Sequence, residues 1–106
     1  VIKILNKNIA NLKCKEKTSI YVEDVFELLN SKSFLKNKFQ IIFLDPPFKE
    51  NKIKELLENL NKSNILDKKG IVILHRNKKY KDLMPQKFKI ELEKTYGLSK
   101  IIFGSF

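Results

Sequence analysis

The sequence predicts an α/β fold in which helices alternate with the strands of a mostly parallel sheet, closed by a C-terminal antiparallel hairpin. Three patterns carry this prediction. Apolar residues at helical spacing alternate along the chain with short apolar runs typical of strands. The run from Gln40 to Leu44 is almost continuously apolar, as expected of a central strand buried on both faces of a parallel sheet. Tyr96-Gly97 separates two strand patterns near the end of the chain, which indicates a hairpin turn.

The first third of the chain contains two helical patterns and one short strand pattern. The first helix is predicted from a stripe of apolar residues at Ile2, Leu5, Ile9 and Leu12. A lysine-rich turn is expected from Lys13 to Lys17, and a short strand from Ser19 to Val22. Asp24 is expected to cap the next helix, because an aspartate oxygen can accept a hydrogen bond from the free N–H groups of a first turn. The apolar face of that helix consists of Val25, Phe26, Leu28 and Leu29, and a polar connector from Ser31 to Lys38 follows.

The remaining elements follow the Gln40–Leu44 strand. A helix is predicted from apolar residues at Ile53, Leu56, Leu57 and Leu60. Gly70 is expected to open a strand from Ile71 to Leu74, and Tyr80 to Pro85 is expected to form a loop. The last two strands are predicted from the alternating residues Phe88, Ile90 and Leu92 and from the apolar run Ile101–Phe103.

The composition indicates one small domain over residues 1–106 of a soluble protein. Hydrophobic residues make up 42% of the chain, and no apolar run approaches the ~20 residues of a membrane span. Cys14 is the only cysteine, which excludes an internal disulfide and favours a reducing, cytoplasmic setting. His75 is the only histidine, so no zinc-type cluster of cysteine and histidine can form, and we expect no metal site.

The charge balance favours a polyanionic partner. The chain has 22 lysines and arginines against 12 acidic residues, a formal net charge of +10. In the cytoplasm such an excess most often serves nucleic-acid binding. Every basic residue except Arg76 is lysine, however, and this profile is equally compatible with an A/T-rich coding sequence.

Several segments together resemble a known enzyme family. These are "NIANL" at 8–12, Val22-Glu23-Asp24-Val25, "IIFLDPPF" at 41–48, "GIVILHRNK" at 70–78 and "YGLSKIIFG" at 96–104. The chain resembles the C-terminal two-thirds of the bacterial 16S ribosomal RNA guanine-N2 methyltransferases, which use S-adenosylmethionine. Asp-Pro-Pro-Phe alone is less specific, because DNA adenine methyltransferases carry close variants of it. The resemblance implies a Rossmann-like class I methyltransferase fold.

The resemblance also assigns roles to individual residues. The DPPF segment, Asp45-Pro46-Pro47-Phe48, is expected to hold the target amine. The amine nitrogen of guanine is a poor nucleophile, and two acceptors that hold its N–H bonds would localise its lone pair toward the methyl donor. Asp45 and the carbonyl of Pro46 are the candidate acceptors, Pro47 restricts the backbone of Pro46, and Phe48 is expected to stack on the flipped base. The resemblance implies that Asp24 binds the adenine amino group of the cofactor, that Val25 lines the adenine pocket, and that Asp45 contributes to cofactor binding.

The same family carries a glycine-rich loop and a ribose-binding acid that would precede Val1. We therefore expect this chain to be an incomplete form that lacks the N-terminal strands and the glycine-rich loop. Such a chain is expected to be inactive alone and to expose an apolar edge, which would make it marginally stable or lead it to self-associate.

Other residues near the DPPF segment have two interpretations each. His75 and Arg76 end a strand at the edge where α/β sheets bind ligands, and they could contact RNA phosphates or the cofactor, or be ordinary surface residues. The same alternatives apply to Lys49, Lys52, Lys78, Lys79 and Lys81. For the protein as a whole, an adenine-N6 methyltransferase of DNA or RNA and a non-catalytic basic RNA-binding module remain the alternatives to the guanine-N2 enzyme.

Overall fold

The computed structural model describes residues 2–12, 18–31 and 38–106. Its elements are the helices α1 (Ile2–Asn11), α2 (Val25–Leu29) and α3 (Glu50–Ser63), and the strands β1 (Phe39–Leu44), β2 (Leu66–Asn77), β3 (Lys89–Tyr96) and β4 (Ser99–Ser105). Cys14, the expected turn at Lys13–Lys17 and most of the expected connector at Ser31–Lys38 lie outside the described residues.

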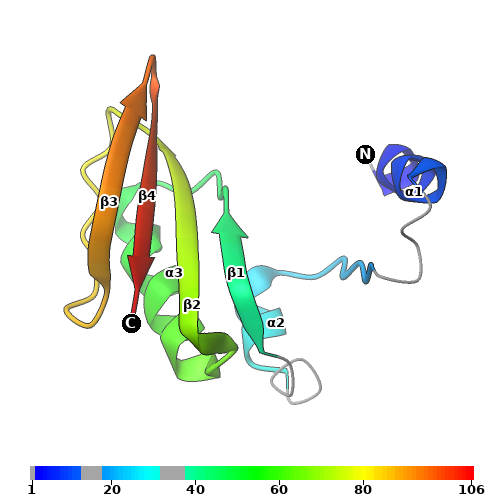
Figure 1. The fold of residues 1–106 in the computed structure, drawn as a ribbon, viewed down its shortest axis with the longest axis horizontal. Helices are drawn as coiled ribbons and strands as arrows, with labels where there is room; N and C mark the ends of the chain where they lie inside the picture. The colour runs from blue at the N-terminus through cyan, green and yellow to red at the C-terminus, as the bar shows by residue number, and fades with distance from the viewer. Residues whose placement is uncertain (1, 13–17, 32–37) are drawn as a thin grey trace.

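The four strands form one mixed sheet in the order β1-β2-β4-β3 (Figure 1). Strands β1 and β2 are parallel and are joined through α3, whereas β4 is antiparallel to both β2 and β3. The expectation of a mostly parallel sheet is therefore wrong, because β4 lies between β2 and β3 and makes two of the three pairings antiparallel. The expected C-terminal hairpin is confirmed. Its turn contains Gly97 at φ +54°, a left-handed conformation that glycine adopts without strain.

One face of the sheet is covered by helices and holds the core. Figure 1 shows α3 behind the sheet, where its apolar stripe meets β2 and β4. The residues with the least exposed area are Ile53, Leu56, Leu57, Leu60, Val72, Leu74 and Ile102. The predicted helical spacing of α3 is thus confirmed. The helix ends at Ser63, and the C-cap residue Asn64 adopts the left-handed conformation common at helix C-termini.

The opposite face is much less covered. Strand β2 alternates along its second half between buried residues on the helix side and half-buried ones on the other side. Ile41 and Phe43 of β1 keep 64% and 60% of their area exposed. The Gln40–Leu44 run was expected to be a central, doubly buried strand. This expectation is wrong, because β1 lies at the edge of the sheet and only its helix-facing side chains pack on the core.

Two further boundaries differ from the sequence-based expectations. Residues 19–22, expected to be a strand, lie in an irregular segment, since a strand requires a neighbouring strand and this segment is not part of the sheet. Strand β2 begins at Leu66 rather than after Gly70, which is buried inside the strand. A Cβ atom at position 70 would lie 2.6 Å from the Leu66 side chain and 2.9 Å from the Asp67 carbonyl oxygen, so a larger residue would force these neighbours to shift.

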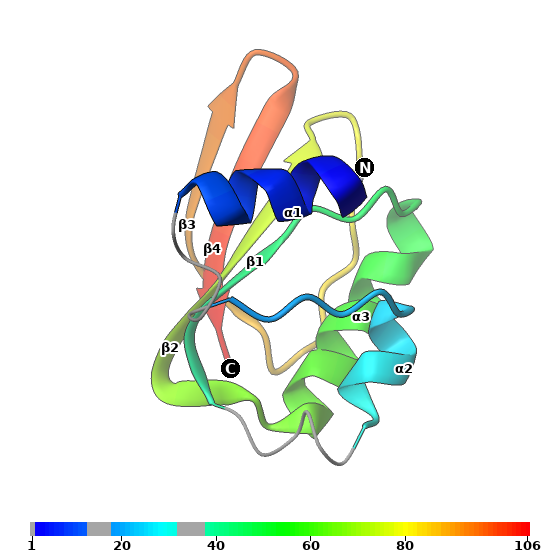
Figure 2. The same ribbon diagram turned by 90° about the vertical axis from the view of Figure 1, so that its right-hand side faces the viewer.

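Helix α1 follows the predicted apolar spacing but buries none of its residues. In both views it lies apart from the covered face of the sheet, beyond the edge strand β1 in Figure 1 and in front of it in Figure 2. The longest described helix, α3, has 14 residues, and no helix of the described ranges could span a bilayer.

Candidate active site

The DPPF segment follows directly after β1, at the end of the sheet where the two parallel strands terminate. Leu44 pairs with Leu74 in the parallel ladder. The next residues along the two chains, Asp45 and His75, therefore lie beside each other on one face, and the residues after them, Pro46 and Arg76, lie beside each other on the opposite face. His75 thus contacts Asp45 on one face of the sheet, and Arg76 contacts Pro46 on the other face.

On the open face, His75 contacts the Asp45 carboxylate. His75 Nδ1 lies 2.9 Å from Asp45 Oδ1, and His75 Nε2 lies 2.9 Å from the hydroxyl oxygen of Ser99 at the start of β4. The Asp45 side chain is 63% exposed and the His75 side chain 32% exposed. Within the described part of the chain, no residue is a hydrogen-bond donor to the second oxygen, Asp45 Oδ2. This carboxylate is held in place and still accessible to a ligand.

On the helix-covered face, Arg76 contacts the backbone of the DPPF segment. Its Nη1 donates to the carbonyl oxygen of Pro46 over 3.2 Å. The guanidinium also donates to both carboxylate oxygens of Asp82, from Nε over 2.7 Å and from Nη2 over 2.9 Å, and it lies 4.4 Å from the ring centre of Tyr80. The Arg76 and Asp82 side chains are 2% and 0% exposed.

The buried pair changes the interpretation of Arg76. A guanidinium that is paired on both sides and withdrawn from solvent cannot also bind RNA phosphates, so an RNA contact through Arg76 is excluded in this structure. Arg76 instead connects the DPPF segment to Tyr80 and Asp82 in the 80–88 loop, which leads from β2 to β3. The Pro46 carbonyl retains acceptor capacity, because a carbonyl oxygen has two lone pairs and Arg76 occupies one.

Phe48 links the DPPF segment to α2. Its ring stacks on Phe26 with the centroids 5.9 Å apart and the planes 20° from parallel. Phe48 is half-buried and packs at the margin of the core. The ring is therefore held on one side by α2.

Asp24 caps α2, as the sequence predicted. The backbone N–H of Phe26 donates to Asp24 Oδ1 over 2.8 Å. Val25 begins the helix and is half-buried against the core. Because Phe26 directly follows this cap and stacks on Phe48, Asp24 and Val25 belong to the element that packs against the DPPF segment.

The lysines near this end of the sheet are exposed, as the sequence suggested. Lys52 makes an ion pair with Glu55 at 3.3 Å and lies over the Phe26 ring, and Lys79 lies over the Tyr80 ring. Lys49 precedes α3, Lys78 follows β2, and Lys81 lies in the loop after β2; all three are exposed. Of these lysines, Lys49 directly follows the DPPF segment, and Lys52 reaches the Phe26 ring on which Phe48 stacks.

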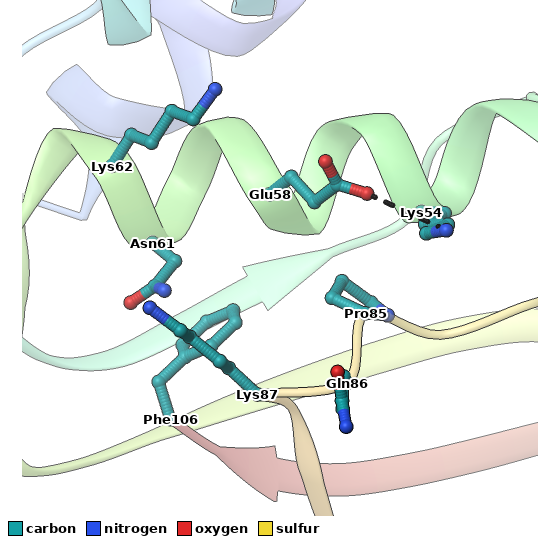
Figure 3. Close-up of a pocket in the computed structure, with 8 residues that line it drawn as sticks. All are labelled: Lys54, Glu58, Asn61, Lys62, Pro85, Gln86, Lys87 and Phe106. Carbon is teal, nitrogen blue, oxygen red and sulfur yellow. Dashed lines mark ion pairs between the residues drawn. The ribbon is translucent and has the colours of Figure 1, made fainter.

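A separate hollow of about 380 Å³ lies between α3 and the 85–87 loop (Figure 3). It is lined by Lys54, Glu58, Asn61, Lys62, Pro85, Gln86, Lys87 and Phe106. It contains none of the predicted site residues. The predicted site residues therefore gather at the end of β1 and β2, not in this hollow.

Sequence reasoning missed the partners of the DPPF segment. Ser99 and Asp82 were not singled out, and the specific contacts of His75 and Arg76 were not predicted. A signal was present, because the two parallel strands were both expected to end near Leu44 and Leu74. Aligning those ends places Asp45 beside His75 and Pro46 beside Arg76.

Comparison with known proteins gives consistent matches over almost the whole chain. A Bacillus subtilis protein named "Putative rRNA methyltransferase YlbH" is 25% identical over 103 residues, which cover 94% of this chain and 55% of that protein. The ribosomal RNA small subunit methyltransferase D of Haemophilus influenzae is 29% identical over 101 residues, covering 89% of this chain and 49% of that protein. A solved structure of a conserved hypothetical protein from Streptococcus pyogenes superposes with a TM-score of 0.80 at 25% identity, covering 96% of this chain and 62% of that one.

The chain thus spans about half the length of the curated relatives that it matches. Residues 1–105 match the protein family described as conserved hypothetical protein 95. Since this match covers nearly every residue, the chain belongs to that family.

Proposed function

We propose that this chain forms the target-amine half of an S-adenosylmethionine-dependent methyltransferase that acts on the exocyclic N2 of a guanine in 16S ribosomal RNA. The two curated relatives are named as an rRNA methyltransferase and a "Putative rRNA methyltransferase", which supports the substrate class. The observation that carries the proposal is the exposure and hydrogen bonding of the Asp45 carboxylate. It is an exposed carboxylate with one oxygen held by His75, and it adjoins a carbonyl held by Arg76.

Asp45 and Pro46 suit the recognition of a planar amine. Such an amine has two N–H bonds, and two acceptors on adjacent residues can each receive one. Asp45 Oδ2 and the second lone pair of the Pro46 carbonyl are the acceptors that we assign to this task. When both N–H bonds are engaged, the nitrogen lone pair is no longer shared fully with the ring and can attack an electrophilic carbon. With the donor bound, the C–N bond would form as the bond between the methyl carbon and the sulfonium sulfur breaks, so that the neutral thioether would be the leaving group. The nitrogen would then lose one proton, and Asp45 is placed to accept it. This is catalysis by positioning and preorganised electrostatics.

Phe48 supports the plane of the base in this proposal. One face of its ring meets Phe26, and we assign the other face to the flipped guanine. Stacking contributes about 1–3 kcal/mol per base and requires only a ring face. A ring fixed by α2 on one side is a suitable platform because it does not have to be ordered when the base arrives.

The residues around Asp24 fit the adenosine end of the cofactor. Asp24 uses Oδ1 for the helix cap, and in the described ranges no residue donates to its Oδ2. An exposed carboxylate oxygen beside the half-buried Val25 suits an adenine, which carries an amino donor on an apolar ring. S-adenosylmethionine supplies an electrophilic methyl group when bound. We assign the adenine contact to Asp24 and Val25 and a further contact to Asp45, and we place the protein in the cytoplasm with its RNA.

The test is the chemical identity of the methylated product. The full-length natural protein that carries this sequence is incubated with labelled S-adenosylmethionine and either 16S rRNA or small ribosomal subunits, and the digested nucleosides are separated by mass spectrometry. We expect N2-methylguanosine. N6-methyladenosine would replace the guanine assignment with the adenine one. RNA binding without any methylated nucleoside would identify a binding module and overturn the proposal.

The 106-residue chain by itself gives a second readout. Because it spans half of its relatives, we expect calorimetric titration with S-adenosylmethionine to show weak binding and no turnover. Micromolar binding with turnover on rRNA would show that these residues alone form a complete enzyme.

A further inference from the structure

Three side chains on the open face form a continuous hydrogen-bonded chain that ends at Asp45. Ser99 Oγ lies 2.9 Å from His75 Nε2, and His75 Nδ1 lies 2.9 Å from Asp45 Oδ1. The three residues come from β4, from β2 and from the residue that follows β1. The contact between His75 and Ser99 follows from the register of β2 and β4. His75 pairs with Ile101 and Asn77 pairs with Ser99, so Ser99 is the diagonal neighbour of His75 on the same face of the sheet.

The chemistry of the three side chains determines which group donates and which accepts in each hydrogen bond. A carboxylate oxygen can only accept a hydrogen bond, so His75 Nδ1 must carry the proton that it shares with Asp45. In a neutral imidazole the other nitrogen then has no proton and must accept. The Ser99 hydroxyl is the donor at that position. The structure therefore requires the Nδ1–H tautomer of neutral His75.

The same three groups, in the same order, form the catalytic triad of serine hydrolases, but the exposure is reversed here. In a hydrolase triad the aspartate is buried and the serine is the nucleophile offered to the substrate. In this protein Asp45 is 63% exposed, whereas Ser99 is half-buried at the start of β4. Asp45 is therefore the residue that a substrate can reach, and Ser99 holds His75 from inside the sheet.

We infer that His75 and Ser99 are positioning residues that fix the Asp45 carboxylate so that Oδ2 faces the target amine. This inference rests on the proposed function of Asp45. An exposed aspartate that lacks such a contact rotates among several side-chain conformations, only some of which direct an oxygen at the substrate. Anchoring Oδ1 through His75 to the sheet removes that freedom before the substrate binds. Misplacement of a reacting group by about 1 Å can lower a rate 100-fold, which sets the scale of the expected benefit.

The tautomer of His75 gives a test that does not depend on activity. His75 is the only histidine, so its imidazole nitrogens can be assigned without ambiguity in a ¹⁵N NMR spectrum of the 106-residue chain. At mildly alkaline pH, where imidazoles are neutral, we expect the Nδ1–H form. Ser99→Ala removes the donor to Nε2 and should shift the population toward the Nε2–H form. Ser105→Ala is the matched control, because Ser105 is a serine of the same strand that contacts Glu91 and not His75.

Steady-state kinetics of the full-length protein test whether the positioning of Asp45 by His75 affects the methyl-transfer rate. His75→Ala should lower kcat about 10- to 100-fold and change KM for S-adenosylmethionine much less, because Asp24 and Val25 keep the adenine contact. His75→Asn keeps a donor near the Nδ1 position and should recover part of the loss. An Nε2–H tautomer in the unmodified chain, or equal spectra for the Ser99 and Ser105 variants, would overturn the inference even if methylation is observed. The expected tautomer without any methylation would instead overturn the proposed function.

Covalent labelling of Ser99 by a fluorophosphonate, a reagent for activated serines, would also contradict the inference. Such labelling would mean that Ser99, and not Asp45, is the reactive residue among the three hydrogen-bonded side chains. We expect no labelling beyond that of the Ser99→Ala variant.

Discussion

Asp45 and Asp82 are two aspartates that are held by neighbouring residues of β2, and they differ in almost every other respect. Asp82 is fully withdrawn from solvent and accepts two hydrogen bonds from the Arg76 guanidinium. Asp45 is mostly exposed, and among the described residues its side chain makes one hydrogen bond, to His75. The alternation of side chains along β2 separates them, because His75 points to the open face and Arg76 to the helix-covered face. A buried acid with both oxygens occupied can only support the fold, whereas an exposed acid with one oxygen open can serve a ligand.

The largest expected effect on stability is at Asp82. Asp82→Asn keeps the shape of the side chain but leaves the buried Arg76 charge uncompensated. Breaking a buried pair in this way costs about 3–5 kcal/mol. Denaturant unfolding of the variant and the unmodified chain measures the change. Asp45→Asn is the matched control, and it should cost less than about 1 kcal/mol because polar contacts between exposed side chains contribute little. Equal losses at the two positions would remove the distinction between them.

The next effect concerns Phe48. Phe48→Ala in the full-length protein should weaken productive RNA binding by about 1–3 kcal/mol, the contribution of one stacked base. Phe48→Tyr should be tolerated because it keeps the ring face. The measurement is the RNA concentration dependence of methyl transfer.

The packing of Phe48 on Phe26 requires its own control. Phe26→Leu removes the aromatic stack but keeps the Phe48 ring and an apolar neighbour. It should reduce stability by about 0.5–1.5 kcal/mol and leave RNA recognition largely unchanged. If Phe48→Ala methylates RNA at the normal rate, Phe48 is only a core residue.

The smallest effect of any single residue is expected among the lysines. RNA binding by this chain should be weak, poor in sequence preference and steeply dependent on salt, since lysine is a point charge suited to phosphates. Arg76, the only arginine, is committed to Asp82 and cannot add base-specific readout. Filter binding across a series of salt concentrations measures the slope. Lys49→Gln or Lys78→Gln should each reduce the slope by about one counterion or less. Binding that does not change with salt would show that the net charge of +10 has no role in RNA contact.

Local features of the fold were predictable from the sequence, and features that depend on distant neighbours were not. The cap at Asp24 depends on a residue two positions away, and the sequence predicted it correctly. The apolar spacing of α3 likewise predicted a helix whose stripe faces the core. The Gln40–Leu44 run looks the same whether its strand lies inside a sheet or at an edge. Its position at the edge depends on which strands lie beside it, and that is not encoded within the run.

The candidate site shows the same division. The order acid-Pro-Pro-aromatic after an apolar run identified the DPPF segment from the sequence alone. The contact between Asp45 and His75 joins residues 30 positions apart, and it depends on the register of two parallel strands. The pairing of Arg76 with Asp82 depends on the path of the 80–88 loop across the helix side of the sheet. From the sequence, an arginine at the end of a strand was therefore equally compatible with an RNA contact, a cofactor contact or an ordinary surface position, and its burial could not be foreseen.

The most direct test of the central claim compares Asp45→Asn with the unmodified full-length protein in one methyl-transfer experiment on 16S rRNA, together with thermal unfolding of both. The account predicts that the variant unfolds at nearly the same temperature and transfers methyl groups about 10²- to 10³-fold more slowly, the loss expected when one preorganised hydrogen-bond partner is removed. Near-normal methyl transfer by a folded Asp45→Asn variant would contradict the assignment of Asp45 to the reaction.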